Sequence, residues 1–204
     1  MSSTAIRAIS PADLDIACEV VGLAFADNPN TLAIARGDPA RAERIMRAGV
    51  RVGKLGRPAS TAIVAEHGGD IVGVLNAAAW PECQMSLGEK LKTAPAMIKA
   101  IGSALPRAFA MLTAWEKHDP KQAHWHIGPI AVRPGLQGQG IGSTMLGSFL
   151  ETVDAAGLPA YLETDVDRNV PLYERFGFKI IARADINGVD NRFLWRAAAQ
   201  SQPI

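Results

Sequence analysis

The sequence predicts an α/β (α+β) fold with a mixed β-sheet flanked by helices. Apolar residues follow the helical period in some segments and the two-residue strand period in others, in the order β-α-α-β-β-α-β-α-β-α-β-β. Tight turns join two pairs of strands while helices connect others, so both antiparallel and parallel pairs are expected. The 204 residues are 48% hydrophobic with a net charge of +1, which suits one globular domain over 1–204 and excludes a disordered chain.

The N-terminal half is predicted to contain a strand, two helices and a hairpin. Pro11 and Pro39 each follow a residue that commonly caps helices, Ser10 and Asp38, and so mark two helix N-termini. Residues 84–118 are expected to form two or three helical pieces, interrupted by Pro95 and Pro106. The other expected elements are a strand over 4–9, a helix over 10–26, a break over 27–30, a helix over 38–55, and strands over 61–66 and 71–79 joined by the turn His67-Gly68-Gly69-Asp70.

The C-terminal half alternates strands and helices. Apolar residues from Ile141 to Val153 recur on one helical face, and Gly157 is expected to end this helix. The dipeptide Asn187-Gly188 is a strong hairpin signal. The expected elements are strands over 124–132, 160–164, 178–185 and 189–195, with helices over 141–157 and 169–176.

Composition excludes several classes of protein. A net charge of +1 gives no electrostatic reason to bind nucleic acid or anionic lipid. No apolar run reaches the roughly 18 residues of a membrane span, and the N-terminus lacks a secretory pattern, so we expect a cytoplasmic protein. Cys18 and Cys83 have no Cys-x-x-Cys spacing, which indicates neither a disulfide scaffold nor a zinc site.

A glycine-rich loop between a predicted strand and a predicted helix is the first functional signal. Its glycines allow a bulky anion to approach the backbone N–H groups at the helix N-terminus. A P-loop would need lysine where Ile141 stands, and a Gly-x-Gly-x-x-Gly dinucleotide motif would need glycine where Ser143 stands. The pattern Gln-x-x-Gly-x-Gly, by contrast, is complete from Gln137 to Gly142.

With this loop, the sequence resembles the GNAT superfamily of acyl-CoA-dependent N-acetyltransferases. Four motifs carry the resemblance: His-Trp-His-Ile-Gly-Pro-Ile-Ala-Val from His124, Gln-Gly-Gln-Gly-Ile-Gly-Ser from Gln137, Tyr-Leu-Glu-Thr from Tyr161, and Asn169 followed by Leu-Tyr-Glu-Arg-Phe-Gly-Phe from Leu172. The resemblance implies a strongly twisted central sheet in which a splayed pair of strands holds acyl-CoA. It places the cofactor-binding core at about 124–180 and implies acetyl-CoA as cosubstrate.

The resemblance also implies roles for residues of this core. Ile130, Ala131 and Val132 would pair with the pantetheine arm, and an amide near Val132 would face the thioester oxygen. Asn169 would hydrogen-bond to the pantetheine, and Arg175 would either reach a CoA phosphate or lie free in solvent. Backbone amides of the loop would hold the pyrophosphate, and the loop residues expected at the cofactor are Gln137, Gly138, Gln139, Gly140, Ile141, Gly142 and Ser143.

Two residues are predicted to carry the proton transfers. In the family that the sequence resembles, a tyrosine of the short helix donates a proton to the departing thiolate, and Tyr173 holds that position; a core tyrosine that anchors the helix is the alternative. For the base, Glu163 shares a strand face with Tyr161, and burial raises the pKa of a carboxyl group toward a useful range. His126 and a water chain are the other candidates.

Metal binding and acceptor binding give weaker signals. His124 and His126 share a strand face, but the sequence offers no third or fourth ligand at a suggestive spacing. We therefore expect no metal, and a packing or substrate-contact role for the histidines. Phe25, Trp80 and Trp115 are candidates for the wall of the acceptor pocket. Arg44, Arg47, Arg51 and Lys54 line one face of the helix over 38–55, which indicates a solvated face or attraction of CoA phosphates.

These features predict an N-acetyltransferase that moves an acetyl group from acetyl-CoA to a primary amine of a small molecule by direct attack in a ternary complex. Apolar, alanine-rich segments with little negative charge disfavour a polycationic acceptor. The alternatives are a catalytically silent acyl-CoA-binding sensor or partner-binding module, and an acetyltransferase for protein or peptide amines. A monomer or homodimer is expected, with no nucleic-acid or membrane partner.

Overall fold

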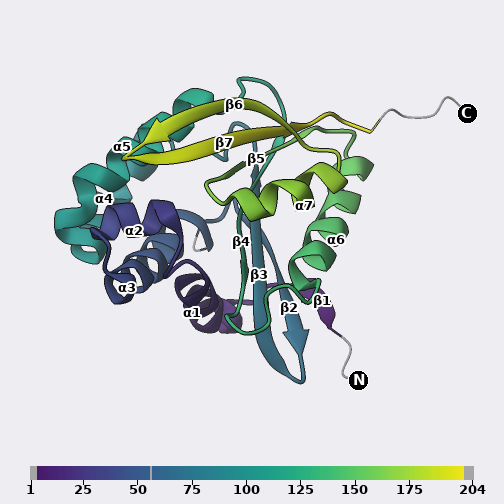
Figure 1. Ribbon diagram of the computed structural model, residues 1–204, viewed down its shortest axis with the longest axis horizontal. Coiled ribbons are helices and arrows are strands. Elements are labelled where there is room, and N and C mark those ends of the chain that lie inside the picture. Colours follow the sequence, from purple (N-terminus) through teal and green to yellow (C-terminus); the bar gives the residue numbers. More distant parts are fainter. Residues whose placement is uncertain (1–3, 56, 200–204) are drawn as a thin grey trace, which may run out of the picture.

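The computed structural model describes residues 4–55 and 57–199, which form a seven-stranded sheet flanked by helices (Figure 1). The strands are β1 (Ala5–Ala8), β2 (Thr61–His67), β3 (Asp70–Ala79), β4 (Trp125–Val132), β5 (Ala160–Thr164), β6 (Lys179–Ile186) and β7 (Val189–Arg196). The α-helices are α1 (Leu14–Ala24), α2 (Pro29–Ala35), α3 (Pro39–Val50), α4 (Leu87–Ile101), α5 (Leu105–His118), α6 (Ile141–Ala155) and α7 (Val170–Arg175). The predicted mixed α/β class is confirmed; the predicted domain over 1–204 extends past the described residues at both ends.

The sheet opens between β4 and β5. Its strand order is β1-β2-β3-β4-β5-β7-β6, and β4 and β5 are the parallel pair in an otherwise antiparallel arrangement. They pair only at Trp125 with Ala160 and at His126 with Tyr161. Beyond these pairs the two strands diverge, and in Figure 1 strands β2 to β4 run across the direction of β6 and β7.

A β-bulge in β4 lies beside this opening. Leu75 of β3 pairs with Ile130 and Ala77 of β3 pairs with Ile127, so two residues of β4 lie opposite the single residue Asn76. The side-chain amide of Asn76 donates a hydrogen bond to the carbonyl of Gly128, at 3.3 Å. Because a bulge bends its strand and increases the twist, this one contributes to the divergence of β4 from β5.

Apolar layers cover both faces of the sheet. Met145, Leu146 and Phe149 of α6 pack in the main core with residues of β3, β4 and β5. On the other face, α1 packs against β2, β3 and β4 through Val20 and Val21. Helices α2 to α5 add a further apolar cluster, and in Figure 1 these helices lie to the left of the sheet. This packing sets the N-terminus of α6 directly after the end of β4.

Three helix predictions differ from the structure. The helix predicted over 10–26 ends at Ala24, and the break predicted over 27–30 contains the start of an unpredicted helix, α2, which Asn28 caps by accepting the Thr31 amide. The helix predicted over 38–55 ends at Val50, and a π-helical turn continues it over Arg51–Leu55. Pro95 lies inside α4 rather than interrupting it. Pro95 and the residue four positions earlier are exposed, so water can supply the hydrogen bond that proline cannot donate.

Both predicted hairpins are confirmed. The β2–β3 pair is antiparallel through the glycine-containing turn after His67, and β6 pairs with β7 through Asn187 and Gly188. These two turn residues have φ of 57° and 82°, the positive values that a type I′ hairpin turn requires. Within the described ranges, no helix has the length and apolar character needed to cross a bilayer.

Candidate active site

The opening between β4 and β5 leaves one edge of β4 without a partner strand. Residues Ile130, Ala131 and Val132 pair with β3 on one side, whereas the pairing with β5 stops at His126. Within the described part of the chain, the peptide groups of 130–132 that face β5 therefore have no strand to bond to. An extended chain that carries amide groups can add to such an edge as a further strand would. The pantetheine arm of acetyl-CoA has this chemistry, so the edge fits the predicted contact.

Backbone donors gather where the loop after β4 enters α6. Gly138 and Gly140 have φ of 77° and 86°, a conformation that favours glycine. The first helical hydrogen bond runs from the amide of Thr144 to the carbonyl of Gly140, at 2.9 Å, so the amides of 141–143 have no acceptor within the helix. These amides lie at the positive end of the helix dipole, which suits a pyrophosphate group.

The two glutamines of the loop brace its backbone. Gln137 donates to the carbonyl of Val132 at 3.1 Å, and Gln139 donates to the carbonyl of Gly135 at 3.3 Å. Both side chains are therefore engaged with the loop itself. The resemblance predicts that both residues contact the cofactor. With their side chains bonded to loop carbonyls, they would do so by shaping the loop and through main-chain amides.

Gly142 provides a direct test of this loop. It lies in the first turn of α6, and an added Cβ would meet only a Val132 methyl at an ordinary 3.7 Å. Gly142→Asp should therefore fold, but its carboxylate would lie close to the pyrophosphate, and like charges a few ångström apart repel strongly. We expect acetyl-CoA affinity, measured by calorimetry, to fall by about 100-fold or more. Gly142→Asn has the same size without the charge and should lose far less; equal affinities of the two variants would contradict this role of the loop.

The short helix α7 and the turn before it carry three of the predicted residues. Asn169, half-buried, ends a 3₁₀ turn, so α7 begins one residue later than the predicted helix over 169–176. Tyr173 is buried and packs edge-on against Phe178, while Arg175 is exposed. Burial, with a smaller effect of Asp165, raises the pKa of Tyr173 to about 12. The phenol therefore keeps its proton at neutral pH, as a hydrogen-bond donor to a leaving group must.

Glu163 of β5 and His126 of β4 meet at the base of the opening. Glu163 Oε2 lies 2.9 Å from His126 Nε2, and the side chains are 5% and 10% exposed. Burial lowers the pKa of His126, but Glu163 and Asp119 outweigh this effect and raise it well above its usual value. His126 Nε2 can therefore donate a hydrogen bond to Glu163. Glu163 Oε1 is buried and has no hydrogen-bond partner among the described residues, so this oxygen can accept a proton.

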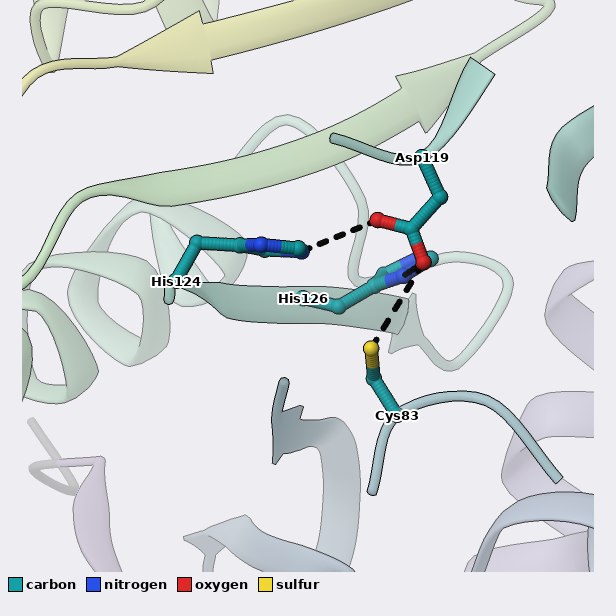
Figure 2. Close-up of side chains that lie close together, drawn as sticks. All are labelled: Cys83, Asp119, His124 and His126. Carbon is teal, nitrogen blue, oxygen red and sulfur yellow. Dashed lines mark hydrogen bonds and ion pairs between the residues drawn. The ribbon is translucent and has the colours of Figure 1, made fainter. Parts of the chain in front are cut away.

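Two residues that no predicted motif contained lie beside the histidines (Figure 2). Asp119 follows α5, and its Oδ1 lies 3.0 Å from His124 Nε2. Cys83, in the turn after β3, has its Sγ 3.6 Å from Asp119 Oδ2. Burial lowers the pKa of His124, but the adjacent Asp119 carboxylate, Cys83 and the Gln122 carbonyl outweigh this effect and raise it to about 9. The spacing Asp-x₄-His-x-His could have suggested Asp119 from the sequence, whereas Cys83 is too distant in the chain for any such signal.

The basic stripe predicted on the helix over 38–55 does not continue to Lys54. Since α3 ends at Val50, Lys54 lies in the π-helical turn. Its pKa is lowered by burial, an effect that the nearby Glu163, Cys83 and Asp119 only partly offset. The other stripe residues face α1 or solvent: Arg47 pairs with Glu19 at 3.9 Å, and Arg51 pairs with Asp15. Lys54 is thus a half-buried amine near the candidate base, not part of a solvated helix face.

The three aromatic residues predicted to line the acceptor pocket pack in different places. Phe25 joins the apolar cluster of α1. The backbone amide of Trp80 donates to the carbonyl of His124, at 2.9 Å. Trp115 packs with residues of β5 and β7 and donates its Nε1 hydrogen to Asn191, at 3.1 Å. An acceptor pocket formed by all three therefore stays a prediction.

A sheet that opens between two parallel strands, with a glycine-rich anion loop at one end and a buried carboxylate at the other, defines an acyl-CoA-dependent transferase. The family model described as "Acetyltransferase (GNAT) family" matches residues 33–178. The chain belongs to the GNAT acetyltransferase family, and it is accordingly an acetyl-CoA-dependent acyltransferase. The resemblance stated from the four motifs is thereby confirmed.

Solved structures of acetyltransferases share this fold. A protein of Corynebacterium glutamicum, titled "histone acetyltransferase HPA2 and related acetyltransferase", has a TM-score of 0.71 and 23% identity, with 100% of each chain covered. Drosophila melanogaster polyamine N-acetyltransferase has a TM-score of 0.63 and 14% identity over 95% of this chain and 98% of that one. A GNAT family acetyltransferase of Brucella melitensis, solved with acetyl-CoA, has a TM-score of 0.52 and 20% identity, covering 98% and 92%. At these identities the similarity is one of fold.

Proposed function

We propose that this protein acetylates the primary amine of a small molecule by direct attack on acetyl-CoA in a ternary complex. The observation that carries the proposal is the free, buried Oε1 of Glu163 on β5, since β5 borders the same opening whose other side is the free edge of β4. The thioester would lie in this opening, with the pyrophosphate at the amides that begin α6.

In this reaction the amine nitrogen attacks the thioester carbon and its proton passes to Glu163. The carbonyl oxygen gains charge as the tetrahedral intermediate forms, and a backbone amide near Val132 donates to it. The C–S bond then breaks, and the sulfur leaves with a proton donated from the hydroxyl of Tyr173. His126 holds Glu163 through the 2.9 Å contact and acts as a positioning residue.

A small acceptor is supported by the acceptors of proteins with a similar fold. One of them is an agmatine N-acetyltransferase, and the Drosophila melanogaster enzyme catalyses the formation of N-acetylagmatine. Of the two buried carboxylates in this region, Asp119 lies against His124 and His126, so Glu163 is the one left to face an ammonium group of the acceptor. We therefore expect monoamines to be preferred over polyamines such as spermidine.

The test is an acceptor panel with acetyl-CoA. The panel contains simple alkylamines, agmatine, spermidine, and peptides with a free N-terminus or a lysine, and the readouts are thiol release and the mass of the product. We expect acetylation of small monoamines with the highest kcat/KM. Acetylation of the peptides alone would establish a protein acetyltransferase instead, and acetyl-CoA binding without thiol release for every amine would establish a silent binding module.

A further inference from the structure

Four side chains with metal-ligating atoms converge next to the candidate base, and the proposed reaction does not use three of them. The four are Cys83, Asp119, His124 and His126, which come from the turn after β3, the end of α5, and β4 with the residue before it (Figure 2). One ligand atom of each lies within 4.8 Å of all the others. All four are buried, and His124 is 0% exposed.

We propose that these four residues bind one Zn²⁺ ion in a closed tetrahedral site. Zinc bonds of about 2.0–2.3 Å place neighbouring tetrahedral ligand atoms about 3.3–3.8 Å apart. Cys83 Sγ lies 3.6 Å and His126 Nδ1 lies 3.7 Å from Asp119 Oδ2, and His124 Nε2 lies 3.0 Å from Asp119 Oδ1. Since one ligand atom of each residue lies within 4.8 Å of all the others, the widest pairs need to approach by up to about 1 Å to surround an ion.

Unpaired buried atoms point to the same centre. Asp119 Oδ1, His124 Nε2 and His126 Nδ1 are all buried and lack a hydrogen bond among the described residues. Asp119 Oδ1 and His124 Nε2 lie in contact, yet they do not satisfy hydrogen-bond geometry. Buried polar atoms without partners are rare in native proteins, and three in one cluster indicate a ligand that satisfies them together.

The atoms of the ligand residues that face away from the ion make hydrogen bonds, as they do in known zinc sites. His124 Nδ1 lies 2.7 Å from the carbonyl of Gln122, which can only accept, so this nitrogen carries the proton and Nε2 is left for the metal. His126 Nε2 donates in the same way to Glu163, at 2.9 Å, which leaves Nδ1 for the metal. Asp119 Oδ2 is held by the side-chain amide of Gln84, at 2.8 Å.

The donor set and its charge select zinc. One sulfur, two imidazole nitrogens and one carboxylate oxygen in a tetrahedron suit Zn²⁺, whereas Mg²⁺ and Ca²⁺ prefer oxygen ligands in larger numbers. The Cys83 thiolate and the Asp119 carboxylate balance the two charges of the ion. Ligands whose charges match that of the ion avoid leaving an unbalanced charge in the buried site.

Four protein ligands leave no open position, so the ion would be structural. It would tie the end of α5 to β4 and to the turn after β3, which the sheet already holds beside β4. Through His126 it would also fix the orientation of Glu163. This site replaces the expectation of no metal, which depended on the lack of a third and a fourth ligand in the sequence. Zinc binding does not require the protein to be an active acetyltransferase.

Metal binding by the full chain, freed of any affinity tag, tests the site directly. After removal of metal with a chelator, titration should show one tightly bound Zn²⁺ per chain by elemental analysis, and Zn²⁺ should raise the Tm. Cobalt should replace zinc and give a thiolate-to-cobalt charge-transfer band together with the visible spectrum of a tetrahedral site. A wild-type chain that retains no stoichiometric zinc and gives no such band would overturn the proposal, because the four residues would then form only a hydrogen-bonded network.

The two cysteines of the chain give a matched pair of variants. Both are buried and unbridged, but only Cys83 belongs to the cluster. Cys83→Ala should lose the charge-transfer band and lower zinc affinity by about 100-fold or more, since even the loss of an outer partner costs about 10–100-fold. Cys18→Ala should keep both properties. The site would be refuted if Cys18→Ala lost the band and Cys83→Ala kept it, or if neither variant lost it. If Cys83→Ala does not fold, the cobalt spectra of the wild type and of Cys18→Ala still decide whether the site exists.

Discussion

Replacing Tyr173 by phenylalanine is expected to lower kcat by about 100-fold while acetyl-CoA binds as before. The substitution removes only the hydroxyl, and the ring keeps its edge-on contact with Phe178, at 6.2 Å between centroids. Burial keeps the phenol protonated, with a pKa raised to about 12, so the hydroxyl can donate to the sulfur as the C–S bond breaks. Thiol release with saturating amine measures kcat, and calorimetry measures acetyl-CoA affinity.

A packing variant distinguishes proton donation by the Tyr173 hydroxyl from a role of its ring in anchoring α7. Phe178→Leu disturbs the same aromatic contact without touching the hydroxyl, and we expect it to lower the Tm more than Tyr173→Phe does while it reduces kcat only a few-fold. If Tyr173→Phe keeps full activity, or if it loses cofactor binding and turnover together, Tyr173 is a core residue that anchors α7. The alternative stated from the sequence would then hold.

Glu163→Gln is expected to have the largest effect on turnover, a fall in kcat of about 10²–10⁴-fold. Glutamine keeps the shape of the side chain and still accepts a hydrogen bond from His126, but its amide cannot take the proton of the attacking amine. Affinity for acetyl-CoA should change little, because the predicted cofactor contacts lie on β4, the loop and the turn before α7. The same thiol-release assay gives kcat for each variant.

Two further variants identify what Glu163 does. Glu163→Asp keeps a carboxylate on a side chain that is one methylene shorter. If Glu163 removes the proton of the amine, this variant should retain more activity than Glu163→Gln. Equal losses would indicate that the residue only shapes the site. Glu174→Gln removes an exposed carboxylate from α7 and should leave kcat unchanged. Zinc content distinguishes this prediction from the metal site, since Glu163→Gln should lose turnover and keep zinc.

The sequence by itself determined the features that depend on neighbours in the chain. The glycine pattern from Gln137 to Gly142 specifies a backbone shape, and that shape together with the start of a helix produces anion-binding amides wherever the rest of the fold lies. Asn187-Gly188 likewise specifies a hairpin turn through its own φ angles. The strand that carries Glu163 and the helix that carries Tyr173 were predictable from local apolar periodicity and caps.

Tertiary structure decided what depends on segments distant in the chain. The opening of the sheet follows from the end of pairing after His126 and the bulge opposite Asn76, and neither leaves a mark in the strand pattern. Lys54 is half-buried near Glu163 because α3 stops early, although its spacing suited an exposed helix face. Cys83 joins the histidines because β3 is the neighbour of β4 in the sheet. A ligand cluster is a property of distances in space, and the sequence fixes such distances only through the packing of the whole sheet.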